Sequence, residues 1–283
     1  MNWYLTDDVE EYADRAWDLL ASDPEASTIG LTIIEAVREG VSYGEVAPTY
    51  GWLELEDGTV AGAVSITPPW PLLLSITPEE SLAHLAHSLR TARVEITEVN
   101  GTTTSVTAFA NVWADGHPLA ADEVMRTRLY RLGTLVVPER APGRARVADE
   151  NDIELVIAWL AAFADEASDG HSHDREEMAR RLMASGRLSL WELDGGEIVS
   201  MAGRRSPAVG VVRVGPVYTP PAHRRNGYGA AVTAACSQAA LDEGASSVVL
   251  FTDLANPISN SIYQAIGYVP LSDRVIVRFV GDH

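Results

Sequence analysis

The chain has 283 residues, 46% of them hydrophobic, and carries 40 acidic against 21 basic side chains, a net charge of −19 at pH 7. All 21 basic residues are arginine, which excludes a pyridoxal-phosphate Schiff base, a Walker-type phosphate loop and a kinase lysine. The negative charge also argues against nonspecific nucleic-acid binding, which depends on cationic contacts with phosphates.

In the first half of the chain, apolar residues at helical spacing predict helices over 7–21 and 28–39. Asp57-Gly58 predicts a hairpin turn between strands at 51–56 and 60–67.

The next stretch begins with a predicted strand and a helix start. Thr77 is expected to cap a helix, with Glu80 as the capping-box partner three residues later. The remaining elements expected in this half are a strand at 72–76, a helix at 78–92, a strand at 94–99, a helix at 103–113 and strand material at 123–137.

A linker is expected where two prolines and a glycine fall within the seven residues Pro138–Arg144. The predicted organisation is a first domain at 1–137, a linker at 138–145 and a second domain at 146–283. The charge is unequal: residues 1–142 hold 8 arginines and 22 acidic residues, net −14, and the remainder is net −5.

The second half is expected to follow the order α-α-β-β-β-α-β-α-β. The first half has a similar order, so we predict two copies of one α+β plan; the alternative is convergence of short α+β patterns. The elements expected in the second half are helices at 149–167 and 174–185, strands at 188–193, 198–204 and 209–219, a helix from 227 to 244, a strand at 247–251, a helix at 258–266 and a strand at 274–280.

One motif in this half has the features of a phosphate-binding turn. The predicted strand ends at Thr219, two prolines follow, and Gly227 and Gly229 open a helix. Glycines allow close backbone approach, and the first N–H groups of a helix point toward a bound anion. Arg224 and Arg225 add guanidinium groups suited to phosphate oxygens. A helix start that binds no ligand has a similar sequence, so this motif alone leaves both interpretations open.

A second motif follows the strand at 247–251. At 100° per residue, Asn256, Ser259, Asn260 and Tyr263 lie on one side of a short helix, opposite its apolar side. These amide and hydroxyl groups are suited to an amide-bearing ligand. An ordinary amphipathic helix with a solvated face is the alternative.

Together, Arg224-x-x-Gly227-x-Gly229 and Asn256-x-x-Ser259-x-x-x-Tyr263-x-x-x-Gly267-Tyr268 resemble the GCN5-related N-acetyltransferase (GNAT) superfamily. The stretch from Gly215 to Tyr268 is similar to a bacterial subgroup of predicted acetyltransferases. The resemblance covers about residues 146–280. It implies an α+β, three-layer GNAT fold, with a mixed central sheet flanked by helices, in two tandem copies.

The resemblance also implies roles for individual residues. The end of the strand at 217–219 would bind the pantetheine arm and acetyl group, and residues 225–230 would surround the pyrophosphate of coenzyme A. Tyr263 would protonate the departing thiolate as a general acid. The binding residues implied are Val217, Tyr218, Thr219, Arg224, Arg225, Asn226, Gly227, Tyr228, Gly229, Ala230, Asn256 and Ser259.

The general base is left open among several groups. Glu166, Asp253, His171 and His173 are candidates that could face the acceptor, and a water relay is an alternative. Nothing near His171-Ser172-His173-Asp174 completes a metal-ligand set, so no metal is expected.

The first half lacks the corresponding motifs. Glu79 and Glu80 stand where a phosphate would bind, and Phe109 stands roughly where Tyr263 falls in the second half. Two carboxylates at that position would repel a pyrophosphate. We therefore expect a degenerate first half that does not bind coenzyme A.

The expected function is an acetyl-CoA-dependent N-acetyltransferase; the alternative is a non-catalytic coenzyme A-binding sensor or partner protein. The expected acceptor is an amine of a small molecule or peptide, and the acidity favours a cationic one. Nucleic-acid and membrane partners are not expected, and the chain is expected to be a monomer or homodimer.

The single cysteine, Cys236, excludes an intramolecular disulfide and is expected in the core. The acidic N-terminus and the absence of a long apolar run predict neither a signal peptide nor a membrane span. A cytoplasmic location is therefore expected.

Overall fold

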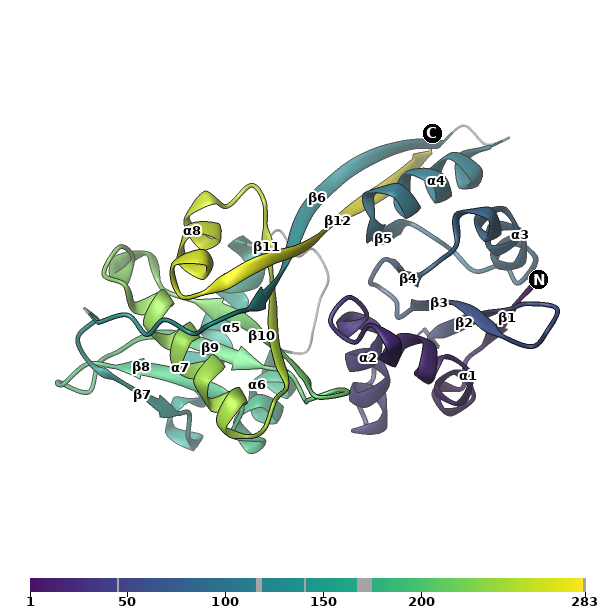
Figure 1. Ribbon diagram of the computed structural model, residues 1–283. Helices are drawn as coiled ribbons and strands as arrows, with labels where there is room; N and C mark the ends of the chain where they lie inside the picture. The colour runs from purple at the N-terminus through teal and green to yellow at the C-terminus, as the bar shows by residue number, and fades with distance from the viewer. Residues whose placement is uncertain (45, 116–118, 140, 167–174, 282–283) are drawn as a thin grey trace. The chain divides into compact units, whose positions relative to one another are not determined.

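The computed structural model describes residues 1–44, 46–115, 119–139, 141–166 and 175–281 (Figure 1). The chain forms two compact units. Unit 1 contains Met1–Leu129 and Ser272–His283, and unit 2 contains Tyr130–Leu271.

Unit 1 repeats the expected order of helices and strands, with one strand added at its start. Its elements are β1 (Asn2–Thr6), α1 (Val9–Ser22), α2 (Thr28–Arg38), β2 (Thr49–Glu54), β3 (Val60–Ile66), β4 (Leu72–Ile76), α3 (Leu82–Thr91), β5 (Glu98–Thr102), α4 (Thr103–Ala114), most of β6 (Leu119–Leu132) and most of β12 (Tyr268–Gly281).

Unit 2 has the same order, again with an added first strand. Its elements are β7 (Arg144–Val147), α5 (Ile153–Glu166), α6 (Arg175–Ala184), β8 (Leu188–Glu192), β9 (Ile198–Arg204), β10 (Val211–Tyr218), α7 (Tyr228–Asp242), β11 (Ser247–Asp253), α8 (Pro257–Ala265), the end of β6 and the start of β12.

Each unit has a mixed sheet. In unit 1 the strand order is β1-β2-β3-β4-β5, followed by the part of β12 that pairs with β5, and in unit 2 it is the end of β6 followed by β11-β10-β9-β8-β7. Neighbouring strands are antiparallel in most pairs, whereas β4 with β5 and β10 with β11 are parallel. The predicted α+β fold with a mixed sheet flanked by helices is confirmed.

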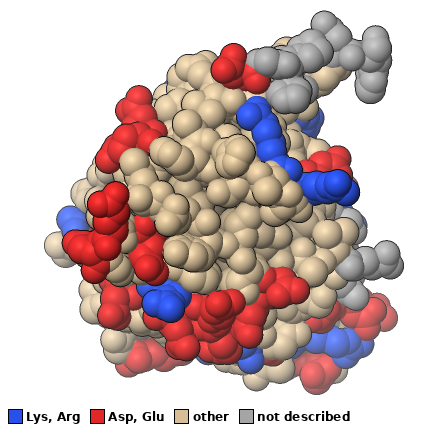
Figure 2. Space-filling model, turned by 90° about the vertical axis from the view of Figure 1, so that its right-hand side faces the viewer, with Lys and Arg blue, Asp and Glu red and all other residues tan. Residues whose placement is uncertain are grey.

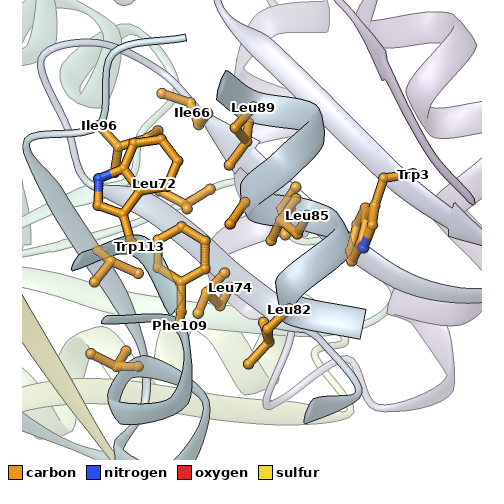
Figure 3. Packing of buried hydrophobic residues seen from close by; sticks show 14 of the residues in the cluster. Trp3, Ile66, Leu72, Leu74, Leu82, Leu85, Leu89, Ile96, Phe109 and Trp113 are labelled. Carbon is orange, nitrogen blue, oxygen red and sulfur yellow. The ribbon is translucent and has the colours of Figure 1, made fainter. Parts of the chain in front are cut away.

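In unit 1, one face of the sheet packs against α3 and α4 (Figure 3). Leu85 and Leu89 of α3 pack with Phe109 and Trp113 of α4 against apolar side chains such as Leu74. In unit 2, one cluster forms around α7, with Cys236 buried as expected, and a second lies under α5 and α6.

The last strand of each half of the chain contributes to the other unit. Tyr130 and Leu132, at the end of β6, belong to the core of unit 2. Residues Arg274 to Arg278 of β12 pair antiparallel with β5 in unit 1, where Val275 joins the core. The compact units therefore differ from the expected domains: 130–137 joins unit 2, and 272–283 joins unit 1.

Several local expectations differ from the structure. Thr77 does not cap a helix: a 3-10 turn at Glu79–Ser81 comes first, with no side-chain cap, and α3 begins at Leu82. Trp3 donates from its Nε1 to the Ser81 carbonyl at 3.1 Å, which ties this turn to β1. The strand expected at 94–99 lies at Glu98–Thr102 instead.

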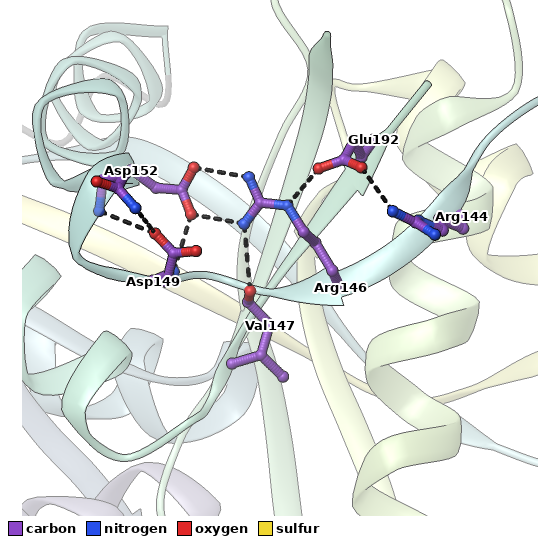
Figure 4. Close-up of polar contacts among 7 residues, drawn as sticks. Arg144, Arg146, Val147, Asp149, Asp152 and Glu192 are labelled. Carbon is purple, nitrogen blue, oxygen red and sulfur yellow. Dashed lines mark hydrogen bonds and ion pairs between the residues drawn. The ribbon is translucent and has the colours of Figure 1, made fainter. Parts of the chain in front are cut away.

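The strand β7 lies partly in the expected linker, and an arginine fixes it in place (Figure 4). Arg146 donates to both carboxylate oxygens of Asp152 at 2.6 and 2.8 Å and to Glu192 at 2.5 Å. These hydrogen bonds lower the pKa of the Asp152 carboxyl. The network joins β7 to the turn before α5 and to β8.

The surface is strongly acidic in places. On the face shown in Figure 2, acidic side chains gather along the lower and left margins, around an uncharged centre. None of the helices in the described ranges combines the length and hydropathy of a membrane span.

Candidate functional site

The two parallel strands of unit 2 stop pairing before they end. β10 and β11 pair from Val211↔Ser247 to Val214↔Leu250, although the strands continue to Tyr218 and Asp253. A register shift between Val214 and Val217 marks a bulge in the pairing of β10 with β9. The backbone at the end of β10 therefore has an edge that the parallel ladder does not use, and unpaired backbone groups need another partner.

The start of α7 follows this strand end. Gly227 is the N-cap of α7 with φ +84°, a left-handed conformation that favours glycine. A Cβ built on Gly229 would lie 3.2 Å from Thr219 Oγ1, so the helix start approaches the strand end closely. The first N–H groups of α7 have no partner within the helix and lie at its positive end, which favours an anion.

The two arginines of this loop have different environments. Arg224 Nη2 donates to both carboxylate oxygens of Glu166 at 2.6 Å, and its Nε donates to the Thr219 carbonyl at 2.9 Å. Its guanidinium also lies 5.9 Å from the ring centre of Tyr218. Arg225 forms no ion pair with the residues that the structure describes, so it is the arginine of this loop best placed to bind an incoming anion.

The end of β10 is held from β9. Ser200 Oγ donates to the Tyr218 carbonyl at 3.0 Å and lies 2.8 Å from Thr219 Oγ1. The Tyr218 ring packs 5.9 Å from Trp159. Burial and the nearby Glu166 raise the pKa of the Tyr218 phenol, while Arg224 acts in the opposite direction.

Tyr263 of α8 is buried in the core of unit 2, at a ring distance of 6.2 Å from Tyr268. Burial raises the pKa of Tyr263 to about 12. The phenol therefore keeps its proton at neutral pH, as a general acid must.

Several predicted site residues form local structure. Asn256 Oδ1 caps α8 by accepting the Ser259 N–H at 3.0 Å, and Asp253 Oδ1 accepts the Ala255 N–H at 2.8 Å. Asn226 Nδ2 donates to two carbonyls of its own loop, at 3.1 and 3.2 Å. These groups shape the loops around the site.

The other predicted residues are spread around the same region. Val217 and Ala230 pack against the unit 2 core, and Tyr228 is buried at the start of α7. His171 and His173 lie outside the described residues.

Two residues hold the α8 side of the candidate site together: Asn260, which the sequence already placed on the polar side of this helix, and Tyr130, which lies outside the predicted set. Asn260 Nδ2 donates to the carbonyls of Asp253 and Asn256 at 2.8 and 2.7 Å. Tyr130 donates from its hydroxyl to Asn260 Oδ1 at 2.9 Å and accepts from Gln264. Tyr130 arrives on β6, far away in sequence, and no local pattern predicts that placement.

In unit 1 the corresponding strands are bridged by an arginine. β4 and β5 pair in parallel at Leu72↔Val99 and Leu73↔Asn100. Just beyond, Arg274 of β12 donates to Asn100 Oδ1 at 3.0 Å and to the Leu74 carbonyl at 3.3 Å. The arginine is 5% exposed, and burial lowers its pKa to about 10.

The counterparts of the unit 2 motifs are also absent from this end of unit 1. Glu79 and Glu80 occupy the turn before α3, and Phe109 is fully buried beside Trp113. Among the described residues of the whole chain, no group of three or more His, Cys, Asp or Glu side chains could hold a metal ion.

Residues 154–268 match the model of the acetyltransferase (GNAT) family. No curated protein matches the chain.

Among solved structures, a tandem GNAT protein from the clavulanic acid biosynthesis pathway is 15% identical, with a TM-score of 0.63, covering 99% of this chain and 98% of that one. A GCN5-related N-acetyltransferase from Sphaerobacter thermophilus is 16% identical, with a TM-score of 0.60, covering 86% and 84%. One from Kribbella flavida is 22% identical, with a TM-score of 0.55, covering 80% and 90%. At these identities the likeness shows the fold.

Proposed function

Residues 154–268 belong to the acetyltransferase (GNAT) family, and we propose that the chain transfers an acetyl group from acetyl-CoA to an amine. The observation that carries the proposal is the end of β10, where parallel pairing stops at Val214 and a glycine-capped helix start follows. An open strand edge beside unpaired helix N–H groups is suited to an amide-bearing arm that ends in a pyrophosphate.

The residues present fit acetyl-CoA, which supplies the thioester. The N–H groups at the start of α7 and the guanidinium of Arg225 would bind the pyrophosphate. The backbone of 217–219 would bind the pantetheine arm and stabilise negative charge on the acetyl oxygen during transfer. Ser200 and Arg224 hold this strand end through the carbonyls of Tyr218 and Thr219.

In the proposed reaction, a neutral amine attacks the thioester carbonyl carbon, a C–N bond forms and the C–S bond breaks. Tyr263 gives its proton to the departing sulfur of coenzyme A. The attacking amine loses a proton to water, and water returns a proton to the Tyr263 phenolate. Of the two predicted carboxylates, Glu166 is bonded through both oxygens to Arg224, whereas Asp253 accepts one backbone N–H at Oδ1, so the general base stays open.

The acceptor is proposed to be an amine of a small molecule or an exposed peptide amine. The net charge of −19 favours a cationic acceptor, because an acidic surface attracts cations. Free-thiol release across a library of amines would identify the acceptor class.

The decisive variant is Tyr263→Phe. It should still bind acetyl-CoA in calorimetry but lose about 10²-fold in kcat, because the general acid is gone. Tyr268→Phe is the matched control, since its buried hydroxyl bonds to Ser237 Oγ at 2.7 Å and it should keep its kcat. Equal turnover of Tyr263→Phe and wild type would overturn the assignment, and binding without any transfer would favour the coenzyme A sensor.

A further inference from the structure

The strand β1 forms one end of the sheet in unit 1, and no other strand in the described part of the chain covers its outer edge. All of its residues pair with β2, from Asn2↔Glu54 to Thr6↔Tyr50. In an antiparallel pair, alternate residues direct their N–H and C=O groups toward the partner strand, and the others direct theirs away from it. The remaining backbone groups of β1 therefore face the open edge.

The end strand of unit 2 is protected in a way that β1 is not. β7 carries Arg144 and Arg146, and both guanidinium groups donate to Glu192. Charged side chains on an edge strand hinder the addition of a further strand. β1 has the sequence Asn-Trp-Tyr-Leu-Thr, with no charged residue and no proline. The side chains of β1 therefore leave its edge able to accept another strand.

A groove of about 380 Å³ lies along β1, between this strand and the exposed side of α3. None of the side chains that line the groove is acidic or an arginine. The residues that contribute to it from the two elements are Trp3, Tyr4 and Leu5 of β1 and His87, Ser88 and Thr91 of α3. The groove gives an added strand a surface against which its side chains can pack.

The two sides of β1 differ in chemistry. Tyr4 stands opposite Trp52 on β2, its ring stacks on Trp52 at 5.5 Å, and the residue is 43% exposed. Glu54 lies two residues beyond Trp52, so it is on the same face as Tyr4. An exposed aromatic ring beside a carboxylate attracts a cation. The opposite side, toward α3, offers only the short hydroxyl side chains of Ser88 and Thr91 and the imidazole of His87.

The surroundings of β1 are acidic. Residues 1–91 hold 16 acidic residues and 3 arginines, a net charge of −13. Asp7 and Asp8 follow β1 directly, and Trp3 of β1 bonds to the Ser81 carbonyl at the end of the turn that carries Glu79 and Glu80. Figure 2 looks onto the side of unit 1 where β1 is labelled in Figure 1, and it shows acidic side chains along the margins of an uncharged centre.

This charge selects the kind of strand that fits. A second copy of the chain would bring its own carboxylates against those beside β1, and like charges repel. A basic segment would instead be attracted to the acidic margins and lose little on entering the uncharged groove.

We propose that the outer edge of β1 accepts an extended basic segment of a partner protein as an additional strand of the sheet. The backbone of that segment pairs with the free N–H and C=O groups of β1. Its lysine or arginine side chains lie toward Tyr4 and Glu54, and short β-branched side chains alternate with them and face Ser88 and Thr91. This surface belongs to unit 1 and does not depend on the function proposed for unit 2.

Fluorescence anisotropy of labelled synthetic peptides with the intact chain tests the proposal. A peptide that alternates lysine with valine should bind saturably, with one site per chain. The same peptide with proline in place of valine keeps the charge but cannot form a strand, so it should bind about tenfold more weakly. A peptide that alternates glutamate with valine should not bind. Equal binding of the proline peptide, or no saturable binding of the lysine–valine peptide, would overturn the proposal.

The variant Thr91→Arg locates the binding. Thr91 is exposed at the end of α3, and an arginine there fills part of the groove and repels a basic peptide, so affinity should fall about tenfold. Gln238→Arg is the matched control, because it adds the same charge at an exposed position of α7 in unit 2 and should leave the affinity unchanged. Circular dichroism checks that both variants fold. Equal affinities of the two folded variants would overturn the proposed location.

Hydrogen–deuterium exchange of the wild-type chain gives a second measurement. Binding of the lysine–valine peptide should slow exchange at the amides of β1, because an added strand engages their N–H groups. Protection confined to other segments would overturn strand addition. Sedimentation of the chain without peptide tests the other occupant: a dimer that Thr91→Arg dissociates would show that a second copy covers β1, contrary to the proposal.

Discussion

Units 1 and 2 contain the same order of elements but differ at two places on their sheets. Where the parallel strands stop pairing, unit 2 has an open strand end and a glycine-capped helix start, whereas unit 1 has a buried arginine and two glutamates. Under the first two helices, unit 2 has a mainly apolar cluster, whereas unit 1 carries Tyr12, Tyr50 and other buried polar groups that have no hydrogen-bond partner among the described residues.

The comparison separates what the fold needs from what a site needs. Both units form the same hairpin and the same parallel pair, so these follow from turn chemistry and apolar patterning alone. The groups proposed to bind acetyl-CoA lie at a strand end and a helix start, where a few substitutions can create or remove a site without changing the architecture.

The largest expected effect concerns the arginine that bridges the strands of unit 1. Arg274→Ala should lower the free energy of unfolding by about 3 kcal/mol, because it leaves a buried cavity and removes hydrogen bonds to Asn100 and Leu74. Urea unfolding followed by circular dichroism measures the change. Arg274→Met, which fills more of the space, should recover part of the loss.

Arg126→Ala is the matched control for this prediction. Arg126 pairs with Glu123 on the surface, and such exposed pairs contribute about 0–1 kcal/mol. A loss for Arg274→Ala no larger than that of Arg126→Ala would mean that the bridge does not stabilise unit 1.

A smaller effect, dependent on pH, is expected in unit 2. Asp152→Asn should cost about 2 kcal/mol at pH 7, because it weakens two charged hydrogen bonds from Arg146. The pKa of the Asp152 carboxyl is lower in the folded than in the unfolded chain. Its stabilising contribution is therefore complete above the pKa that this carboxyl has in the unfolded chain.

That contribution is lost as the pH falls through the lowered pKa of the folded state. The difference between wild type and Asp152→Asn in urea unfolding should therefore shrink steadily from pH 5 to pH 2. A difference that stays constant over this range would contradict the assigned role of the Arg146 network.

The smallest expected effect concerns the helix start that distinguishes unit 2. Gly227→Ala should weaken acetyl-CoA binding about tenfold, or about 1.4 kcal/mol, because alanine is strained at φ +84° and the first N–H groups of α7 turn away. Gly196→Ala is the matched control. Gly196 has φ +83° in a hairpin turn, so its replacement should destabilise the fold about as much as Gly227→Ala does but leave the affinity for acetyl-CoA unchanged.

Calorimetric titration with acetyl-CoA measures this affinity and also counts the acetyl-CoA sites per chain. Wild type should bind one acetyl-CoA per chain, because unit 1 lacks the glycine-capped helix start and places Glu79 and Glu80 in its stead. Two equivalents per chain would remove the proposed distinction between the units.

The sequence predicts the features that depend on neighbours along the chain. Asp57-Gly58 and Gly227 act on their own turns, and the hairpin and the helix start lie where they are expected. The strands β1 and β7 are missed because they are short and their partners lie far away in sequence.

The positions of two residues, Tyr130 and Arg274, also cannot be predicted from neighbouring residues in the sequence. Tyr130 and Arg274 reach their positions only because β6 and β12 cross between the units, and no local periodicity encodes such a crossing. The residue type of Arg274 also predicts the wrong exposure, because an arginine in a strand is normally expected to face solvent. Long-range pairing therefore decides these two contacts, which the sequence does not predict.

The exchange of final strands also sets an order of events on the ribosome. Unit 2 has all of its residues once Leu271 is made, whereas unit 1 waits for the strand residues that follow Ser272. Until they emerge, β5 keeps an open edge, and open edges are sites of mispairing. We therefore expect the half of the chain that is translated first to complete its fold last.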